Sequence, residues 1–84
     1  MNTLSVIVRD RTGVLYQGEA KTVSGKNEKG PFDVLPEHAN FLTLISDEVV
    51  IRLSGDTKSF KLTRGMLSVV DDQVTILLGV IPNK

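Results

Sequence analysis

Apolar and polar residues alternate along most of this chain, and turn-forming residues interrupt the alternation at short intervals. The alternation is clearest in residues 4–8, 49–53, 60–62 and 74–78. A period of two places one set of side chains on one face, so each segment predicts a β-strand with one buried face. The intervals leave no room for a crossover helix of about a dozen residues, so we expect mainly antiparallel pairing of the strands.

Five further segments are short and bounded by turn residues, which makes them weaker strand candidates. They are residues 14–17, 19–24, 32–35, 41–45 and 66–70. The turns that separate the strands are expected at residues 11–13, 18, 25, 30–31, 46–47, 54–56, 64–65 and 71–72. Two packed layers are the simplest way to bury so many one-sided strands. The sequence therefore predicts one domain over residues 1–84, an all-β, antiparallel two-layer β-sandwich of about ten short strands.

Charge and composition exclude several classes of function. Ten basic and ten acidic residues are interspersed, so no basic surface is available for nucleic acid or an anionic membrane. No cysteine is present for a disulfide or a thiolate metal site, which suits a reducing compartment. The longest apolar run covers residues 76–81, whereas a helix needs about 20 residues to cross a bilayer. The N-terminus lacks the features of a signal peptide, so we expect a cytoplasmic protein with no direct membrane insertion and no nucleic-acid partner.

The single histidine, His38, is the only residue around which an active site could be imagined. Asp33 and Glu37 are near it in the sequence and could serve in acid–base chemistry. A metal site usually needs about three or four converging ligands, and the chain has neither a second histidine nor a cysteine. A lone histidine after a proline turn is more often a capping or packing residue. We therefore expect no catalytic residue, no metal site and no cofactor.

Other functional motifs are also missing. None of the serines lies in the Gly-x-Ser-x-Gly turn of a nucleophile. Residues 25–30 carry two glycines but lack the Gly-Lys-Ser/Thr ending by which a P-loop holds phosphate and magnesium. An oligonucleotide-binding barrel would need aromatic platforms beside a basic groove, and this chain has only four aromatic residues, most of them in core-like patterns. The residue patterns thus favour an interaction module and leave its partner open.

Residues 30–45, GPFDVLPEHANFLTLI, resemble the hallmark of the epsilon subunit of F-type ATP synthases, which is called delta in mitochondria. In that family a Gly-rich turn leads into an apolar pair, Pro-x-His-Ala and a strand of the Leu-Leu-Thr type. Matching stretches follow the family's order and spacing at residues 4–8, 14–20, 65–70 and 74–78. The resemblance therefore covers nearly the whole chain, and it implies a ten-stranded β-sandwich.

The resemblance also implies a role. The family's domain is a non-catalytic part of the rotary central stalk, where it clasps the gamma subunit and rests on the ring of c subunits at the inner face of the cell membrane. Carried over by position, the residues that would face gamma are Arg9, Asp10, His38 and Thr43. The loop of residues 25–33 would face the c ring through Lys26, Asn27, Glu28, Lys29, Phe32 and Asp33. A packing role for Pro36, His38 and Ala39 stays open beside the gamma contact.

The chain departs from the family pattern in two places. Asp33 occupies the position where a glycine commonly precedes the apolar pair, and residues 26–29 lengthen the loop before it. The chain ends at residues 81–84, where the family usually continues into a helical hairpin that senses ATP, so we expect no ATP binding. The alternative function, from another class, is a free-standing β-sandwich adaptor that works outside a synthase.

Overall fold

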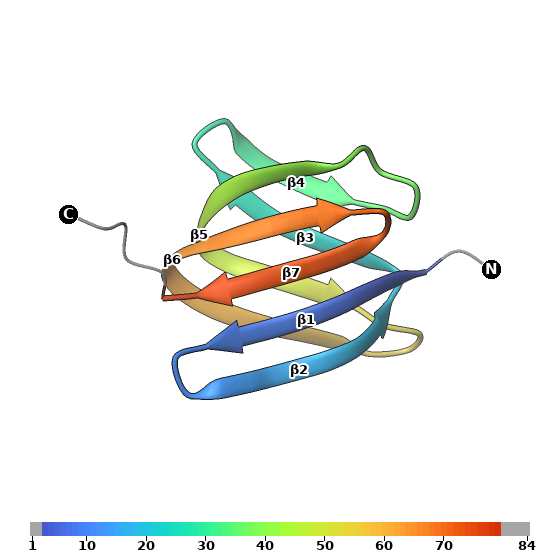
Figure 1. Cartoon of the computed structure of the whole chain (residues 1–84), viewed down its shortest axis with the longest axis horizontal. Helices are drawn as coiled ribbons and strands as arrows, with labels where there is room; N and C mark the ends of the chain where they lie inside the picture. Colours follow the sequence, from blue (N-terminus) through green and yellow to red (C-terminus); the bar gives the residue numbers. More distant parts are fainter. Residues whose placement is uncertain (1–2, 80–84) are drawn as a thin grey trace.

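The computed structural model describes residues 3–79, and these residues form seven β-strands and no helix (Figure 1). The strands are β1 Leu4–Asp10, β2 Gly13–Ala20, β3 Thr22–Asn27, β4 Gly30–Val34, β5 Phe41–Arg52, β6 Thr57–Val70 and β7 Gln73–Leu78. The predicted all-β class is confirmed. Residues 81–84, on which the expectation about ATP binding rests, lie outside the described residues, and so does the end of the apolar run 76–81.

All seven strands belong to one sheet, in the order β2-β1-β7-β6-β5-β3-β4. Neighbouring strands are antiparallel with one exception, the parallel pair β1 and β7, in which Val6 lies opposite Val74. The prediction of an antiparallel sandwich is therefore wrong at this pair. A parallel pair needs a long connection, and here the connection is the whole chain between the first and last strands. Short intervals between strands constrain only strands that are consecutive along the chain, and β1 and β7 are not consecutive.

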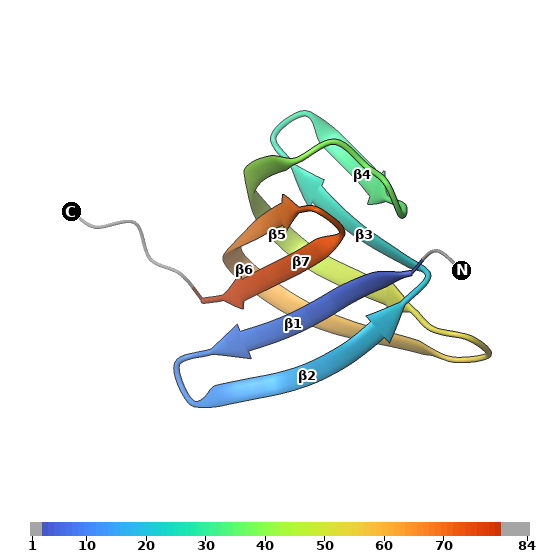
Figure 2. The ribbon, with the colours of Figure 1, turned by 45° about the vertical axis from the view of Figure 1, so that its right-hand side comes forward.

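The sheet folds over into two layers because β5 and β6 run through both of them (Figures 1 and 2). Residues 50–52 of β5 pair with β3 in one layer. Residues 65–70 of β6 pair with β7 in the other. The predicted count of about ten short strands is wrong for the same reason, since β5 and β6 are each continuous through a site that the sequence had marked as a turn.

The first of these sites is a β-bulge where the two long strands bend. On one side of the bend Ile45 pairs with Gly65, and on the other side Asp47 pairs with Leu62. The step between these pairs is two residues on β5 and three on β6. The extra residue lies in β6, and it changes which alternate residues of that strand face the core. Leu62 faces the core before the bulge, and Leu67 does so after it. Asp47 takes a φ of 73° at the bend.

Gly18 and Gly65 predicted turns but lie inside strands, as Gly25 does. A Cβ at Gly65 would lie 2.6 Å from the carbonyl oxygen of Leu77 and 2.7 Å from Cδ1 of Leu62. A Cβ at Gly18 would lie 2.8 Å from the hydroxyl oxygen of Tyr16, whose ring folds over that glycine. Both glycines permit a close approach of neighbouring atoms, which is the other use of glycine in a strand.

Two predicted hairpin turns are confirmed. Residues 71–72 connect β6 to β7 with φ values of 48° and 65°, as a two-residue hairpin turn of the primed type requires. In the turn between β5 and β6, Gly55 has a φ of 82°. The N–H of Leu53 donates to the carbonyl of Asp56 at 2.8 Å, so Ser54 and Gly55 form the centre of this turn. These two residues lie within the predicted turn at residues 54–56.

The core lies between the layers, and every strand contributes to it. The predicted inward faces of β1, β7 and the second half of β5 are confirmed, since their alternate apolar residues are buried. The buried apolar residues are Leu4, Val6, Val8, Ala20, Val23, Val34, Ile45, Val49, Ile51, Leu67, Val69, Val74 and Ile76. Burial of a large aliphatic side chain contributes about 1.5–3 kcal/mol, so this cluster is the main source of stability.

Replacing Ile51 by Asp tests the core. Ile51 has no exposed surface, so Ile51→Asp should place an unpaired carboxyl group between the layers. Protonation of the carboxyl group would relieve part of this cost. We still expect the free energy of unfolding to fall by more than about 3 kcal/mol and the cooperative thermal transition to disappear. Ser59→Asp, on the outer face of β6 in the same layer, should melt close to wild type. Wild-type melting of the Ile51→Asp variant would contradict the assigned face.

Replacing Gly65 by Ala tests the contact between β6 and β7. The added Cβ would press against the backbone oxygen of Leu77, which cannot rotate away as a side chain can. We expect a loss of about 1–3 kcal/mol in the free energy of unfolding, measured by urea titration. The control is Ser68→Ala in the same strand, which adds no atom and should shift the midpoint little. Equal midpoints for the two variants would show that the strands separate freely at Gly65.

Candidate interaction surface

The segment expected to be a loop, residues 25–33, is a β-hairpin. Gly25 lies opposite Phe32, and Asn27 lies opposite Gly30, so only two residues form the turn. A Cβ at Gly25 would lie 3.0 Å from Cζ of Phe32, so this glycine makes room for an aromatic ring across the strand pair. Gly30 takes a φ of 116°, which explains the second glycine. The hairpin thus positions its side chains more firmly than a solvated loop would.

The charged residues of the hairpin are exposed. Nζ of Lys26 lies 3.0 Å from Oδ2 of Asp47, at the bend of β5, and the two side chains are 53% and 63% exposed. An exposed ion pair of this kind contributes about 0–1 kcal/mol. Glu28 and Lys29 form the tip, where the N–H of Lys29 donates to Oδ1 of Asn27 at 2.9 Å. Three charges are therefore available to a partner at this end of the sheet.

Asp33 is held within the sheet by polar neighbours. The Ser24 hydroxyl donates to Oδ1 of Asp33 at 2.5 Å, and Arg52 donates to Oγ of Ser24 at 2.6 Å. The three residues lie on β4, β3 and β5, so they form a polar row across the outer face of one layer. Asp33, where the resemblance implies a glycine, thus has a hydrogen-bond partner of its own in the structure.

Asn27 and Thr43 join the two predicted contact regions. Nδ2 of Asn27 donates to Oγ1 of Thr43 at 3.1 Å in a partly buried position. The resemblance implies a c-ring contact for Asn27 and a gamma contact for Thr43, and the two residues are far apart in the sequence. In the fold they touch, because the first half of β5 lies beside the β3–β4 hairpin.

An aromatic row continues this junction. The ring centroids of Phe32 and Phe41 are 5.8 Å apart and nearly perpendicular, at 82°. The His38 ring lies 5.0 Å from that of Phe41 at 41°. Edge-to-face contacts of this kind add favourable energy beyond burial. Phe32 is thus half-buried against Phe41 within the fold, and His38 is the exposed end of the row.

The loop of residues 35–40 contains the Pro-Glu-His-Ala sequence that is part of the resemblance. The N–H of His38 donates to the carbonyl of Leu35 at 3.1 Å, which closes a turn with Pro36 and Glu37 at its centre. Nδ1 of the His38 ring lies 2.7 Å from the carbonyl of Ala39, so it carries the proton and donates. This geometry supports the packing interpretation of Pro36 and His38. The ring is also exposed, so a partner can still reach it.

The loop is tied to the β6–β7 turn by two hydrogen bonds that no pattern in the sequence predicted. The N–H of Glu37 donates to Oδ1 of Asp72 at 2.6 Å. The N–H of Asp71 donates to Oδ1 of Asn40 at 2.8 Å. We call these two hydrogen bonds the clasp. Asp and Asn in turns can indicate hydrogen bonds to nearby backbone groups. They could not indicate a partner more than 30 residues away in the sequence.

Arg9 and Asp10 lie at the end of β1, away from His38. The Asp10 carboxylate accepts the Thr12 hydroxyl at 2.6 Å and the Thr12 N–H at 2.8 Å. These hydrogen bonds, the side-chain one first, hold the pKa of Asp10 below its ordinary value. The β1–β2 turn and the β3–β4 turn lie at one end of the sandwich, and the loop of residues 35–40 lies at the other (Figures 1 and 2). The structure thus divides the predicted gamma residues between two regions.

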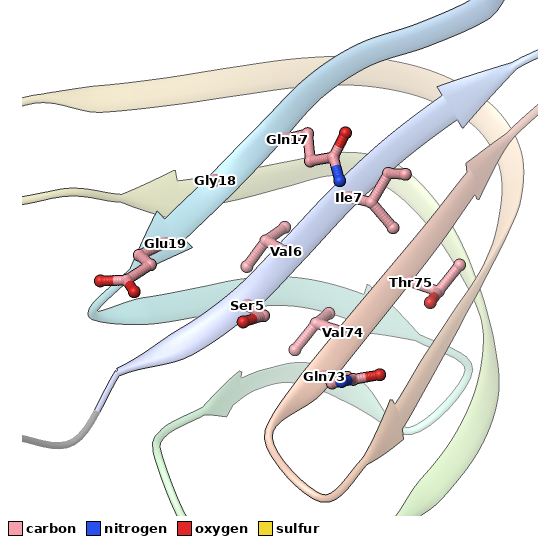
Figure 3. Close-up of a pocket in the computed structure, with 9 residues that line it drawn as sticks. All are labelled: Ser5, Val6, Ile7, Gln17, Gly18, Glu19, Gln73, Val74 and Thr75. Atoms are coloured by element: carbon pink, nitrogen blue, oxygen red, sulfur yellow. The ribbon is translucent and has the colours of Figure 1, made fainter.

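A shallow hollow lies on the outer face of β2, β1 and β7 (Figure 3). Its lining includes the outward-facing side chains of Ser5, Ile7, Gln17, Glu19, Gln73 and Thr75. Glu19 is the one titratable side chain among the residues of this lining. Within residues 3–79, no group of three or more His, Cys, Asp or Glu residues is placed to hold a metal ion. The same residues include no helix with the length and apolar character that a membrane crossing demands.

Comparison with known proteins identifies the family. The family described as "ATP synthase, Delta/Epsilon chain, beta-sandwich domain" matches residues 3–82. The ATP synthase epsilon chain of Nitratiruptor sp. is 35% identical over 85 residues, covering 98% of this chain and 66% of that protein. The ATP synthase epsilon chain of Sulfurimonas denitrificans is 32% identical over 81 residues, covering 93% and 62%. The chain therefore spans less than two thirds of the length of these relatives.

Solved structures show the same fold at low sequence identity. A chain in the mitochondrial ATP synthase of Euglena gracilis matches with a TM-score of 0.85 and 13% identity, over 93% of this chain and 51% of that one. A chain in the central stalk and c-ring structure of the Tetrahymena thermophila mitochondrial ATP synthase matches with a TM-score of 0.76 and 17% identity, over 89% and 62%. These identities support the fold alone.

The resemblance seen in residues 30–45 is confirmed by these comparisons, because the family match extends over nearly the whole chain and through every strand of the sheet. The relatives that share about a third of its residues carry one common description. The chain belongs to the ATP synthase delta/epsilon family, and residues 3–82 correspond to the β-sandwich domain of that family.

Proposed function

We propose that this chain works as a non-catalytic central-stalk subunit of a proton-translocating rotary ATP synthase. It would pass the rotation of the c ring to the catalytic head through gamma, as a peripheral component at the cytoplasmic face of the cell membrane. The observation that carries the proposal is the family match over residues 3–82, together with relatives described as ATP synthase epsilon chains. No catalytic group is required for this role.

The β3–β4 hairpin is the proposed contact with the c ring. Lys26, Glu28 and Lys29 project from a two-residue turn and its flanking strand, where they can pair with charged loops of a partner. Asn27 and Phe32 instead contact β5 residues of this chain, so we assign them the task of holding the hairpin in place. Asp33 has the same supporting task through Ser24.

The proposed contact with gamma is centred on His38 and Thr43. Both lie next to the hairpin through the Asn27 hydrogen bond and the Phe41 ring, so the two proposed partner surfaces adjoin. Arg9 and Asp10 would form a separate gamma contact near the β1–β2 turn, at the end of the sandwich opposite the loop of residues 35–40. A packed sandwich deforms little under load, so contacts at its two ends can move as one body.

Reconstitution tests the proposal directly. The purified chain should bind its cognate gamma subunit at micromolar concentration or below, and it should purify together with gamma and the c ring when these are produced in the same cells. Failure to bind cognate gamma at that concentration would count against the central-stalk role and favour an adaptor outside the synthase.

Replacing the three charged hairpin residues together tests the proposed ring contact. Lys26→Ser, Glu28→Ser and Lys29→Ser remove exposed groups and one surface ion pair, so the free energy of unfolding should fall by no more than about 1 kcal/mol. Binding to c ring in the presence of gamma should weaken, and the loss should shrink at high salt because exposed charges are screened.

A matched control replaces Glu19, Lys21 and Lys61 by Ser. These residues are exposed on β2, on the β2–β3 connection and on β6, and they have the same charges as the hairpin set. The control variant should bind the c ring as wild type does. Equal losses for both triple variants would indicate a general charge effect, and a large drop in melting temperature for the hairpin variant would show that its charges are structural.

A further inference from the structure

The loop of residues 35–40 is ordered without the help of the core. Leu35 is 52% exposed, and the four residues from Glu37 to Asn40 are all exposed. Burial therefore does little to choose one conformation for the segment, although it connects β4 to β5 and presents His38. Its geometry must depend on the few hydrogen bonds and ring contacts that it makes.

The clasp is the long-range part of those contacts, and it is reciprocal. The loop donates the Glu37 N–H to the side chain of Asp72, and it supplies the Asn40 side chain to the N–H of Asp71. Each segment thus contributes one backbone donor and one side-chain acceptor. The bond to the Asp72 carboxylate is of the charge-assisted kind, which is the stronger class.

The backbone on both sides is in a conformation that needs such support. Glu37, Asp71 and Asp72 have φ values of 69°, 48° and 65°, in the left-handed region that side chains with a Cβ adopt at a cost. Two of these three residues, Glu37 and Asp71, are the donors of the clasp. The hydrogen bonds therefore hold the loop at the residue where an alternative backbone conformation is most accessible.

His38 follows Glu37 directly, so the clasp fixes the backbone that carries its ring. On the other side of His38, Nδ1 donates to the Ala39 carbonyl and the ring contacts Phe41, whose position is set by β5. With the Glu37 hydrogen bond lost, the ring would keep its contacts with Ala39 and Phe41, while the backbone before it would lose its link to the β6–β7 turn.

We propose that Asn40 and Asp72 are positioning residues, which hold the loop of residues 35–40 so that His38 is presented to the gamma subunit. This inference rests on the proposed function, since it assigns a task to the His38 contact. The β6–β7 turn needs neither residue 40 nor the loop to form, because residues 71–72 already close a two-residue hairpin. The clasp therefore acts on the loop rather than on the fold of the sheet.

The first measurement is amide hydrogen exchange in the purified chain, followed by NMR. Asp72→Ala should accelerate exchange at Glu37, and Asn40→Ala should accelerate it at Asp71, by about tenfold or more for a lost hydrogen bond. Asp72→Asn retains an acceptor oxygen and should restore most of the protection. Gln73→Ala, next to the same turn on the outer face of β7, is the matched control and should change neither amide.

The second measurement is affinity for the cognate gamma subunit. Asp72→Ala and Asn40→Ala should each weaken binding by about tenfold, as expected for losing one hydrogen bond that preorganises a contact. Asp72→Asn should bind nearly as wild type does. In a chain that carries His38→Ala, the further change Asp72→Ala should weaken binding much less, because the group that the clasp presents is already gone.

The outcomes separate the inference from the proposed function. If wild type does not bind gamma, the central-stalk role and the positioning role are both wrong. If wild type binds gamma but Asp72→Ala leaves exchange at Glu37 unchanged, the clasp is wrong while the proposed function stands. If exchange accelerates and affinity for gamma does not change, or if Asp72→Ala costs as much affinity with His38→Ala as without it, the positioning role is wrong.

Discussion

The fold depends on the pairing of β5 with β6, two long strands that pass together from one layer to the other. Their pairing spans the bulge between Ile45 and Asp47, and there the sheet turns over on itself. The first half of β6 and the second half of β5 belong to the layer of β3, and the remaining halves belong to the layer of β7. Without that bend the inward faces of the outer strands would have no second layer to cover them.

The same bend places the candidate surface. The first half of β5 lies beside the β3–β4 hairpin, where Thr43 accepts from Asn27 and Phe41 contacts Phe32. Asp47, at the bend itself, pairs with Lys26. Three contacts with β5 thus hold the hairpin, and a load applied at its tip passes into the strand that runs through both layers.

The alternation of residues predicted the class of fold, the inward faces and most of the strands, because side-chain burial on one face of a strand is a local property. It could not predict that β5 and β6 are continuous. Gly65 permits close packing inside a strand, but in the sequence a glycine indicates a turn equally well. The alternation also could not predict the pairing of β1 with β7 or the hydrogen bond between Asp72 and Glu37, because both join segments far apart in the sequence. The resemblance indicated the surface residues, but the contact of Asn27 with Thr43 required the fold.

The two edges of the sheet indicate how partners can bind. Pro31 removes one backbone donor from the edge strand β4. On β2, the other edge, the Tyr16 hydroxyl donates to the carbonyl of Glu19 at 2.9 Å and so occupies an acceptor. An incoming strand would find one backbone group fewer at each edge, and such changes weaken edge-to-edge pairing. Side chains on turns and on the loop of residues 35–40 are therefore the better contacts for a partner. Their presentation depends on the few hydrogen bonds that fix those segments.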